Sequence, residues 1–142
     1  MLNIEFIFYL PDSRHLMLKT SIRLDINFRI GNVDPRIFGG FIEHMGRCIY
    51  GGIYEPESEF ANKDGFREDV LESLAQLNIP VVRYPGGNFA SGYNWMDGIG
   101  DEKKRPVIRD FAWQSIEPNT FGTDEFMKLC NKMNWDPMIT VN

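Results

Sequence analysis

Hydrophobic and polar positions divide the chain into short apolar runs and longer amphipathic segments. Val81 and Val82 form a β-branched apolar run that ends in Arg83, which is typical of a buried strand in a parallel sheet. Segments 37–42 and 137–141 have the same character. The pattern therefore predicts three strands of the parallel type.

Two amphipathic helices are predicted between these strands. The first can be capped by Asp64 and closed by Asn78, and its apolar stripe comprises Phe66, Val70, Leu71, Leu74 and Leu77. The second is predicted to begin at Thr123 as its N-cap, and its stripe comprises Phe126, Met127, Leu129, Cys130 and Met133. Cys130 is therefore interpreted as a core residue.

The predicted order is strand, loop, helix, strand, loop, helix, strand, which is typical of a parallel sheet. The loops after the strands, 45–63 and 85–122, are long, whereas the turns after the helices are short. This asymmetry is typical of a (β/α)8 barrel, whose active site is built on the loops that follow the strands. A complete barrel takes about 250 residues. The predicted fold class is therefore α/β, as an amino-terminal portion of a TIM barrel with about three strands.

The first thirty residues have a different pattern. Apolar and polar residues alternate over 21–26, which predicts a half-buried strand of an antiparallel sheet. We expect residues 17–30 to contribute a strand to an accessory β-sandwich, and residues 31–142 to form the incomplete barrel. Residues 1–16 make a poor secretory signal and do not share the patterning of the later segments. We expect them to be an unstructured or non-native extension, with the biological start at Met17.

Composition and charge narrow the classes of function. The 142 residues are 43% hydrophobic and 25% charged, as in a globular protein. The formal net charge of −5 and the lack of a basic stripe argue against a nucleic-acid partner. No apolar run approaches the roughly 20 residues of a membrane span. Cys48 and Cys130 form no metal-binding pattern and suit a reducing compartment, although one disulfide stays open. We therefore expect a cytoplasmic protein without a metal or other cofactor.

Polar side chains follow the predicted strands at their carboxyl ends. Glu43 and His44 come after the first strand, and Arg83 ends the second, just ahead of Asn88. Ligands of α/β folds bind at this end of the strands. With 13% aromatic residues in the chain, the sequence predicts a polar, aromatic-lined ligand site. The segment 85–88 lacks both the glycine spacing and the Lys-Ser/Thr of a phosphate loop.

Each of these residues also has a structural interpretation. Arg83 and Glu43 can form an ion pair that joins two strand ends. Asn88 can be a turn residue in left-handed geometry, and Trp113 can be a core residue. His44 is interpreted as a packed histidine in preference to an acid or base. The charged run 101–105 is interpreted as a solvated surface turn.

Several segments resemble one known family in the same order. Residues 41–56, FIEHMGRCIYGGIYEP, resemble the first barrel strand and loop of the family 51 α-L-arabinofuranosidases. Residues 82–89, VRYPGGNF, resemble the second strand and its loop. The resemblance runs from about residue 23 to residue 142 and continues through the segments 91–95, 97–100, 112–117 and 119–126.

The resemblance implies a retaining glycosidase that releases terminal non-reducing α-L-arabinofuranosyl groups from arabinan, arabinoxylan or their oligosaccharides. Two glutamates carry out the chemistry in that family, an acid/base after the fourth strand and a nucleophile after the seventh. Both positions are expected beyond residue 142, so no catalytic residue is assigned within the chain. The resemblance also implies that the full-length protein is a homo-oligomer.

Sugar binding is what the resemblance implies for this chain. Glu43 is similar to a residue that accepts hydrogen bonds from arabinofuranose hydroxyls, and Arg83 and Asn88 are similar to polar residues of the same pocket. Trp113 is similar to an aromatic residue near the cleaved bond. We expect Arg83 to keep Glu43 ionised, because a nearby cation favours a charged carboxylate.

Two other functions stay open on the sequence alone. The chain can be a truncated, catalytically inactive sugar-binding remnant, since the two glutamates of the family are not in it. It can also be part of another barrel glycosidase, for example one that acts on glucans.

Overall fold

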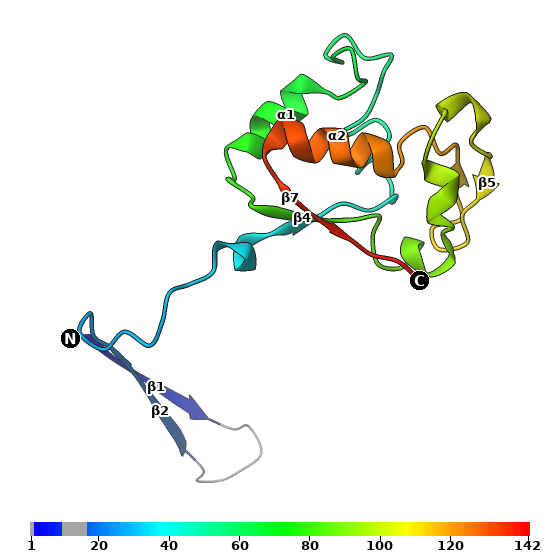
Figure 1. Cartoon of the computed structure of the whole chain (residues 1–142). Helices are drawn as coiled ribbons and strands as arrows, with labels where there is room; N and C mark the ends of the chain where they lie inside the picture. Colours follow the sequence, from blue (N-terminus) through cyan, green and yellow to red (C-terminus); the bar gives the residue numbers. More distant parts are fainter. Residues whose placement is uncertain (1, 10–16) are drawn as a thin grey trace. The chain divides into compact units, whose positions relative to one another are not determined.

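The structure is a computed structural model that describes residues 2–9 and 17–142. The chain divides into two compact units, 1–34 and 35–142, which are described separately. Figure 1 shows the elements of both units. The candidate site residues all belong to the second unit.

The first unit contains two antiparallel strands, β1 (Leu2–Tyr9) and β2 (Met17–Leu24). Ile4 lies opposite Ile22, and Leu2 lies opposite Leu24. Of the two expectations for residues 1–16, an unstructured segment is wrong for β1, which pairs with β2, and a non-native extension stays a prediction. Residues 1 and 10–16 of that predicted segment lie outside the described residues. A biological start at Met17 stays a prediction.

The second unit contains a parallel sheet of three strands. These are β3 (Gly40–Phe41), β4 (Val81–Tyr84) and β7 (Asp136–Ile139), with β4 in the middle. Helix α1 (Glu68–Ala75) lies between β3 and β4 in the chain, and α2 (Thr123–Met133) lies between β4 and β7. Figure 1 shows both helices on the same side of β4 and β7. The predicted alternation of strands and helices is therefore confirmed.

The first predicted strand, 37–42, is shorter than expected. Its start is the 3-10 helix η1 (Pro35–Phe38), in which the Gly39 N–H donates to the Arg36 carbonyl at 3.0 Å. This bond closes a turn, so the segment joins the sheet only from Gly40.

The first predicted helix also starts later than expected. Asp64 does not cap α1, because the Asn62 side chain accepts the N–H groups of Asp64 and Phe66 at 2.9 and 3.1 Å. The Arg67 N–H donates to the Ile53 carbonyl at 2.9 Å. These amides are held by the loop, and the helix begins only at Glu68. Asn78 has the expected left-handed backbone, with φ of 50°.

The core lies between the helices and the sheet and is rich in aromatic rings. Tyr84 of β4 stacks on Phe126 of α2, with ring centroids 4.7 Å apart. Cys130 is 1% exposed, so the interpretation of this thiol as a core residue is confirmed. The core also contains Ile42, Ile49, Tyr54, Phe66, Leu71, Val82, Phe121 and Leu129.

The loop between β4 and α2 contains five short segments of structure. They are η2 (Phe89–Gly92), η3 (Trp95–Gly98), η4 (Glu102–Lys104), β5 (Ile108–Arg109) and β6 (Ile116–Glu117), of which β5 and β6 pair as an antiparallel hairpin. The prediction of a solvated turn over 101–105 is wrong for Arg105. Its guanidinium is buried and binds the Glu125 carboxylate through two nitrogens, at 2.7 and 3.2 Å.

Glu125 also caps α2. Its carboxylate accepts the N–H of Gly122 at 2.8 Å, and Gly122 is the N-cap of the helix, so the prediction of Thr123 as the N-cap is wrong by one residue. Among the described residues, no helix is long and apolar enough to cross a membrane.

Gly122 and Gly98 pass each other with almost no space between their backbones. A Cβ added at Gly122 would lie 1.9 Å from the Gly98 carbonyl oxygen, whereas a Cβ at Gly92 would meet nothing within 4 Å. Gly122→Ala is therefore expected to lower the free energy of unfolding by about 1–3 kcal/mol. Gly92→Ala, the matched control, should change it by less than about 0.5 kcal/mol. Denaturant titration of both variants provides the measurement, and equal midpoints would refute the close contact.

Candidate functional site

Glu43 lies two residues after β3, at the carboxyl end of the parallel sheet, and its side chain is buried. Its Oε1 accepts the backbone N–H of Phe89 at 2.9 Å and the indole Nε1–H of Trp113 at 3.1 Å. The Gly87 N–H is a further donor to this carboxylate. A single carboxylate thus joins the end of β3 to two separate parts of the loop that follows β4.

The first glycine after Pro85 is required by this arrangement. Gly86 has φ of 137°, and a Cβ at this position would lie 2.2 Å from Cγ of Glu43. Only glycine allows the backbone to pass this close to the carboxylate. The glycine break after β4 therefore brings the N–H groups of the loop to Glu43.

The Glu43 carboxyl is held in its ionised form. Burial by itself raises its pKa, but the hydrogen bonds from Phe89, Trp113 and Gly87 outweigh burial, and the Arg83 charge adds to them. The net pKa lies below its ordinary value. The expectation that Arg83 keeps Glu43 ionised is thus correct in direction, but the hydrogen-bond donors contribute more than the cation.

Arg83 lies on β4 directly opposite Phe41 of β3. Its guanidinium carbon is 5.3 Å from the centroid of the Phe41 ring, within cation–π distance. Its Nε is buried and has no hydrogen-bond partner among the described residues. Because a buried donor without a partner is costly, this N–H is suited to a ligand oxygen.

Asn88 is exposed and precedes η2. Its backbone is right-handed, with φ of −62° and ψ of −42°, so the interpretation as a left-handed turn residue is wrong. Asn88 lines a hollow of about 710 Å³ together with residues 89, 91–93 and 108–112. Asn88 is exposed at this hollow, while the next residue, Phe89, donates its N–H to Glu43.

Trp113 lies in the turn of the β5–β6 hairpin and is 37% exposed, so it is not a core residue. The Asp110 carboxylate fixes this turn by accepting the N–H groups of Ala112 at 3.0 Å and Trp113 at 2.7 Å. Trp113 also borders a hollow of about 300 Å³ that is lined in part by His44, Met45 and Ser115. The structure thus places Glu43 against Trp113 and next to Arg83, whereas Asn88 lies against the neighbouring hollow.

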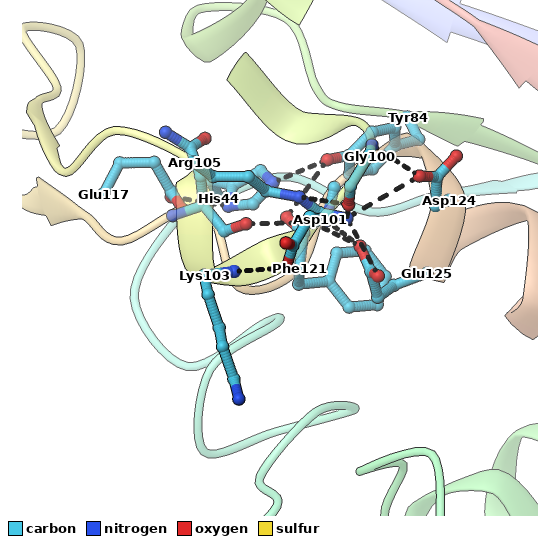
Figure 2. A network of polar contacts seen from close by, with 12 residues as sticks. His44, Tyr84, Gly100, Asp101, Lys103, Arg105, Glu117, Phe121, Asp124 and Glu125 are labelled. Atoms are coloured by element: carbon cyan, nitrogen blue, oxygen red, sulfur yellow. Dashed lines mark hydrogen bonds and ion pairs between the residues drawn. The ribbon is translucent and has the colours of Figure 1, made fainter. Parts of the chain in front are cut away.

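A buried polar network beside Glu43 could not be read from the sequence. Figure 2 shows His44, Tyr84 and Glu117 within it. His44 Nδ1 lies 2.7 Å from Glu117 Oε2, and His44 Nε2 lies 3.0 Å from the Tyr84 hydroxyl. The packed-histidine interpretation of His44 is confirmed by its 5% exposure. Glu117 lies in a segment that resembles the family, but nothing local in the sequence marks its burial among residues distant in the chain.

In the described part of the chain, no group of three or more His, Cys, Asp or Glu side chains is arranged so that it could hold a metal ion.

Known proteins are similar to this chain in both sequence and structure. Residues 73–142 match the family model described as the alpha-L-arabinofuranosidase 1 domain. A probable alpha-L-arabinofuranosidase C of Aspergillus fumigatus is 52% identical over 122 residues, which are 86% of this chain and 24% of that protein. An intracellular exo-alpha-(1->5)-L-arabinofuranosidase of Acetivibrio thermocellus is 48% identical over 126 residues, which are 89% of this chain and 25% of that protein.

Two solved structures agree with these relationships. The family 51 alpha-L-arabinofuranosidase of Bifidobacterium longum aligns with a TM-score of 0.78 and 50% identity, over 80% of this chain and 22% of that one. The thermostable enzyme of the same family from Thermotoga petrophila aligns with a TM-score of 0.74 and 52% identity, over 75% and 22%. The chain spans about a quarter of the length of the curated relatives it matches. It is thus related to the family 51 α-L-arabinofuranosidases and corresponds to a partial, amino-terminal region of them.

Proposed function

We propose that the full-length protein hydrolyses terminal non-reducing α-L-arabinofuranosyl groups of arabinan- or arabinoxylan-type oligosaccharides, with retention of configuration. One observation carries the proposal. A buried, ionised Glu43 contacts the Trp113 indole beside Arg83, whose Nε is unpartnered among the described residues, at the carboxyl end of a parallel sheet. The two curated relatives compared above are named as arabinofuranosidases, and one is named as exo-acting on α-(1→5) linkages.

The chemistry of these residues fits the recognition of a furanose. An ionised carboxylate accepts hydrogen bonds from sugar hydroxyls, and a guanidinium and an amide supply donors. Glu43, Arg83 and Asn88 supply these three groups. The indole of Trp113 offers an apolar face to the C–H groups of a sugar ring.

The sheet supports a proposal about the rest of the fold. Phe41 and Met138 flank Arg83 in register, and they are 66% and 52% exposed. We propose that this face lines the interior of a (β/α)8 barrel, of which β3, β4 and β7 are the first three strands. We further propose that residues 17–30 join an accessory β-sandwich of the full-length protein.

In this proposal the acid/base and the nucleophilic glutamate lie beyond residue 142. Retaining glycosidases hold these two carboxyls about 5–5.5 Å apart, so both must come from the remaining part of the barrel. A homo-oligomeric state and a cytoplasmic location of the full-length protein are part of the same proposal. The relative from Acetivibrio thermocellus is named as intracellular.

The isolated 142-residue chain is expected to be catalytically silent. It should release no product from an aryl α-L-arabinofuranoside above a control without enzyme, because both catalytic carboxyls are expected outside it. The full-length protein at the same molar concentration is the positive control. Turnover that survives repurification and follows the chain through the column would contradict the assignment.

Glu43→Gln in the full-length protein is expected to lower kcat/KM by about ten- to a hundredfold at pH 7. The variant loses the charge and one acceptor, and a hydrogen bond to a charged group contributes roughly 1.5–3 kcal/mol, at about 1.4 kcal/mol per tenfold. Glu72→Gln, on the exposed side of α1, is the matched control and should match the wild type. Normal turnover by the folded fraction of the Glu43 variant would show that Glu43 is structural.

The stability contributed by Glu43 should depend on pH. Its pKa in the folded protein lies below the value of about 4.5 of an unperturbed carboxyl. The wild type should therefore be more stable than Glu43→Gln above about pH 4.5, and this difference should be lost as the pH falls through the lower, folded-state pKa. Denaturant titrations of both proteins between pH 2 and 7 provide the measurement. A difference that is constant across this range would show that the carboxyl is not ionised preferentially in the folded state.

A further inference from the structure

His44 and Glu117 form a buried contact that lies behind the proposed sugar pocket. Nδ1 of His44 is 2.7 Å from Oε2 of Glu117, a close approach that does not have hydrogen-bond geometry, and the two side chains are 2% and 3% exposed. His44 directly follows Glu43, and Glu117 is the last residue of β6. The contact therefore joins the end of β3 to the hairpin that carries Trp113. Figure 2 shows the side chains of His44 and Glu117.

Glu117 is held from its other side as well. Its Oε1 accepts the hydroxyl of Tyr50 and, at 2.7 Å, the N–H of Asn119. Burial raises the pKa of the Tyr50 hydroxyl, and the charge of Glu117 raises it further, so the phenol stays a donor. With these partners the Glu117 carboxylate has a fixed position from which it faces His44.

His44 is fixed by β4 and by the loop after it. Its ring stacks on Phe89 with centroids 4.3 Å apart and an angle of 20° between the planes, and its Nε2 lies 3.0 Å from the Tyr84 hydroxyl. The Phe89 N–H is the group that binds Glu43. Glu43 and His44, neighbours in the chain, thus hold the same loop, one by its backbone and the other by its aromatic ring.

The same two neighbours hold the β5–β6 hairpin. Among the described residues, two side chains of the segment 108–117 make polar contacts with the rest of the unit. Trp113 contacts Glu43, and Glu117 contacts His44, Tyr50 and Asn119. Much of the hairpin is solvent-exposed, with Phe111 of the turn at 77% and Ile116 of β6 at 66%. The hairpin that carries Trp113 is therefore anchored at Glu117, and the indole itself is held by its hydrogen bond to Glu43.

We infer that His44, together with Glu117, is a positioning residue for Trp113, and that it sets the orientation in which the indole meets the sugar bound at Glu43. The inference rests on the proposed function for the part that concerns the sugar. His44 touches neither the sugar nor the reacting atoms in this role. Loss of the contact lets the hairpin and its indole move, and displacements of about 1 Å in such groups can lower a rate a hundredfold.

A double-mutant cycle in the full-length protein tests this coupling. His44→Gln and Trp113→Phe are each expected to lower kcat/KM by about tenfold, and the double variant should be no more than about twofold below Trp113→Phe alone, since both changes remove one function. Val70→Ala, a half-buried core change on α1, is the control. The fold-change in kcat/KM caused by Val70→Ala should multiply with the fold-change caused by Trp113→Phe, as expected for two independent sites.

A second measurement does not depend on activity. In protein labelled with ¹⁵N-tryptophan, the indole N–H signal of Trp113 should shift in His44→Gln toward its position in Glu43→Gln, while the signals of Trp95 and Trp135 stay in place. Glu117→Gln should shift the Trp113 signal in the same way. This variant retains an acceptor for Tyr50 and Asn119, and it replaces His44→Gln in the test if His44→Gln does not fold.

The outcomes separate the inference from the proposed function. A shifted Trp113 signal in a protein without arabinofuranosidase activity upholds the positioning role and overturns the proposed function. An unchanged Trp113 signal, or losses of kcat/KM that multiply in the double variant, would show that His44 and Glu117 only stabilise the fold.

Discussion

The carboxylate of Glu43 sits at the end of a short strand, and N–H groups from two distant segments converge on it. Burial opposes its charge, but these donors and the nearby Arg83 restore it. The geometry leaves no room for a side chain at Gly86. The position of the loop after β4, the placement of Trp113 and the charge at the centre of the site all depend on this one group.

Around this carboxylate, polar and aromatic packing are combined. The ring of His44 is enclosed by Phe89, Tyr84 and Tyr50, while its nitrogens meet Glu117 and Tyr84. Further from the site, Arg105 and Glu125 form a second buried pair that holds the long loop against α2. Buried charges of this kind are tolerated when every partner is present, which explains why so long a connection has a defined path.

The two faces of the sheet have different surroundings. The face with Val82 and Tyr84 is covered by the helices and belongs to the core. The other face presents Phe41, Arg83 and Met138. This second face is the one that we propose lines the interior of a barrel.

The sequence by itself determined the order of strands and helices, the core position of Cys130 and the end of the sheet at which polar residues gather. These features depend on local periodicity and on glycine and proline breaks, which involve only neighbouring residues. The motif residues Glu43, Arg83, Asn88 and Trp113 could be named from their resemblance to one family. Only the tertiary structure decided that Trp113 donates to Glu43. It also decided that Arg105 and Glu117 are buried, since burial and hydrogen bonding of these groups depend on partners 20 to 73 residues away in the chain, such as Glu125 for Arg105 and His44 for Glu117.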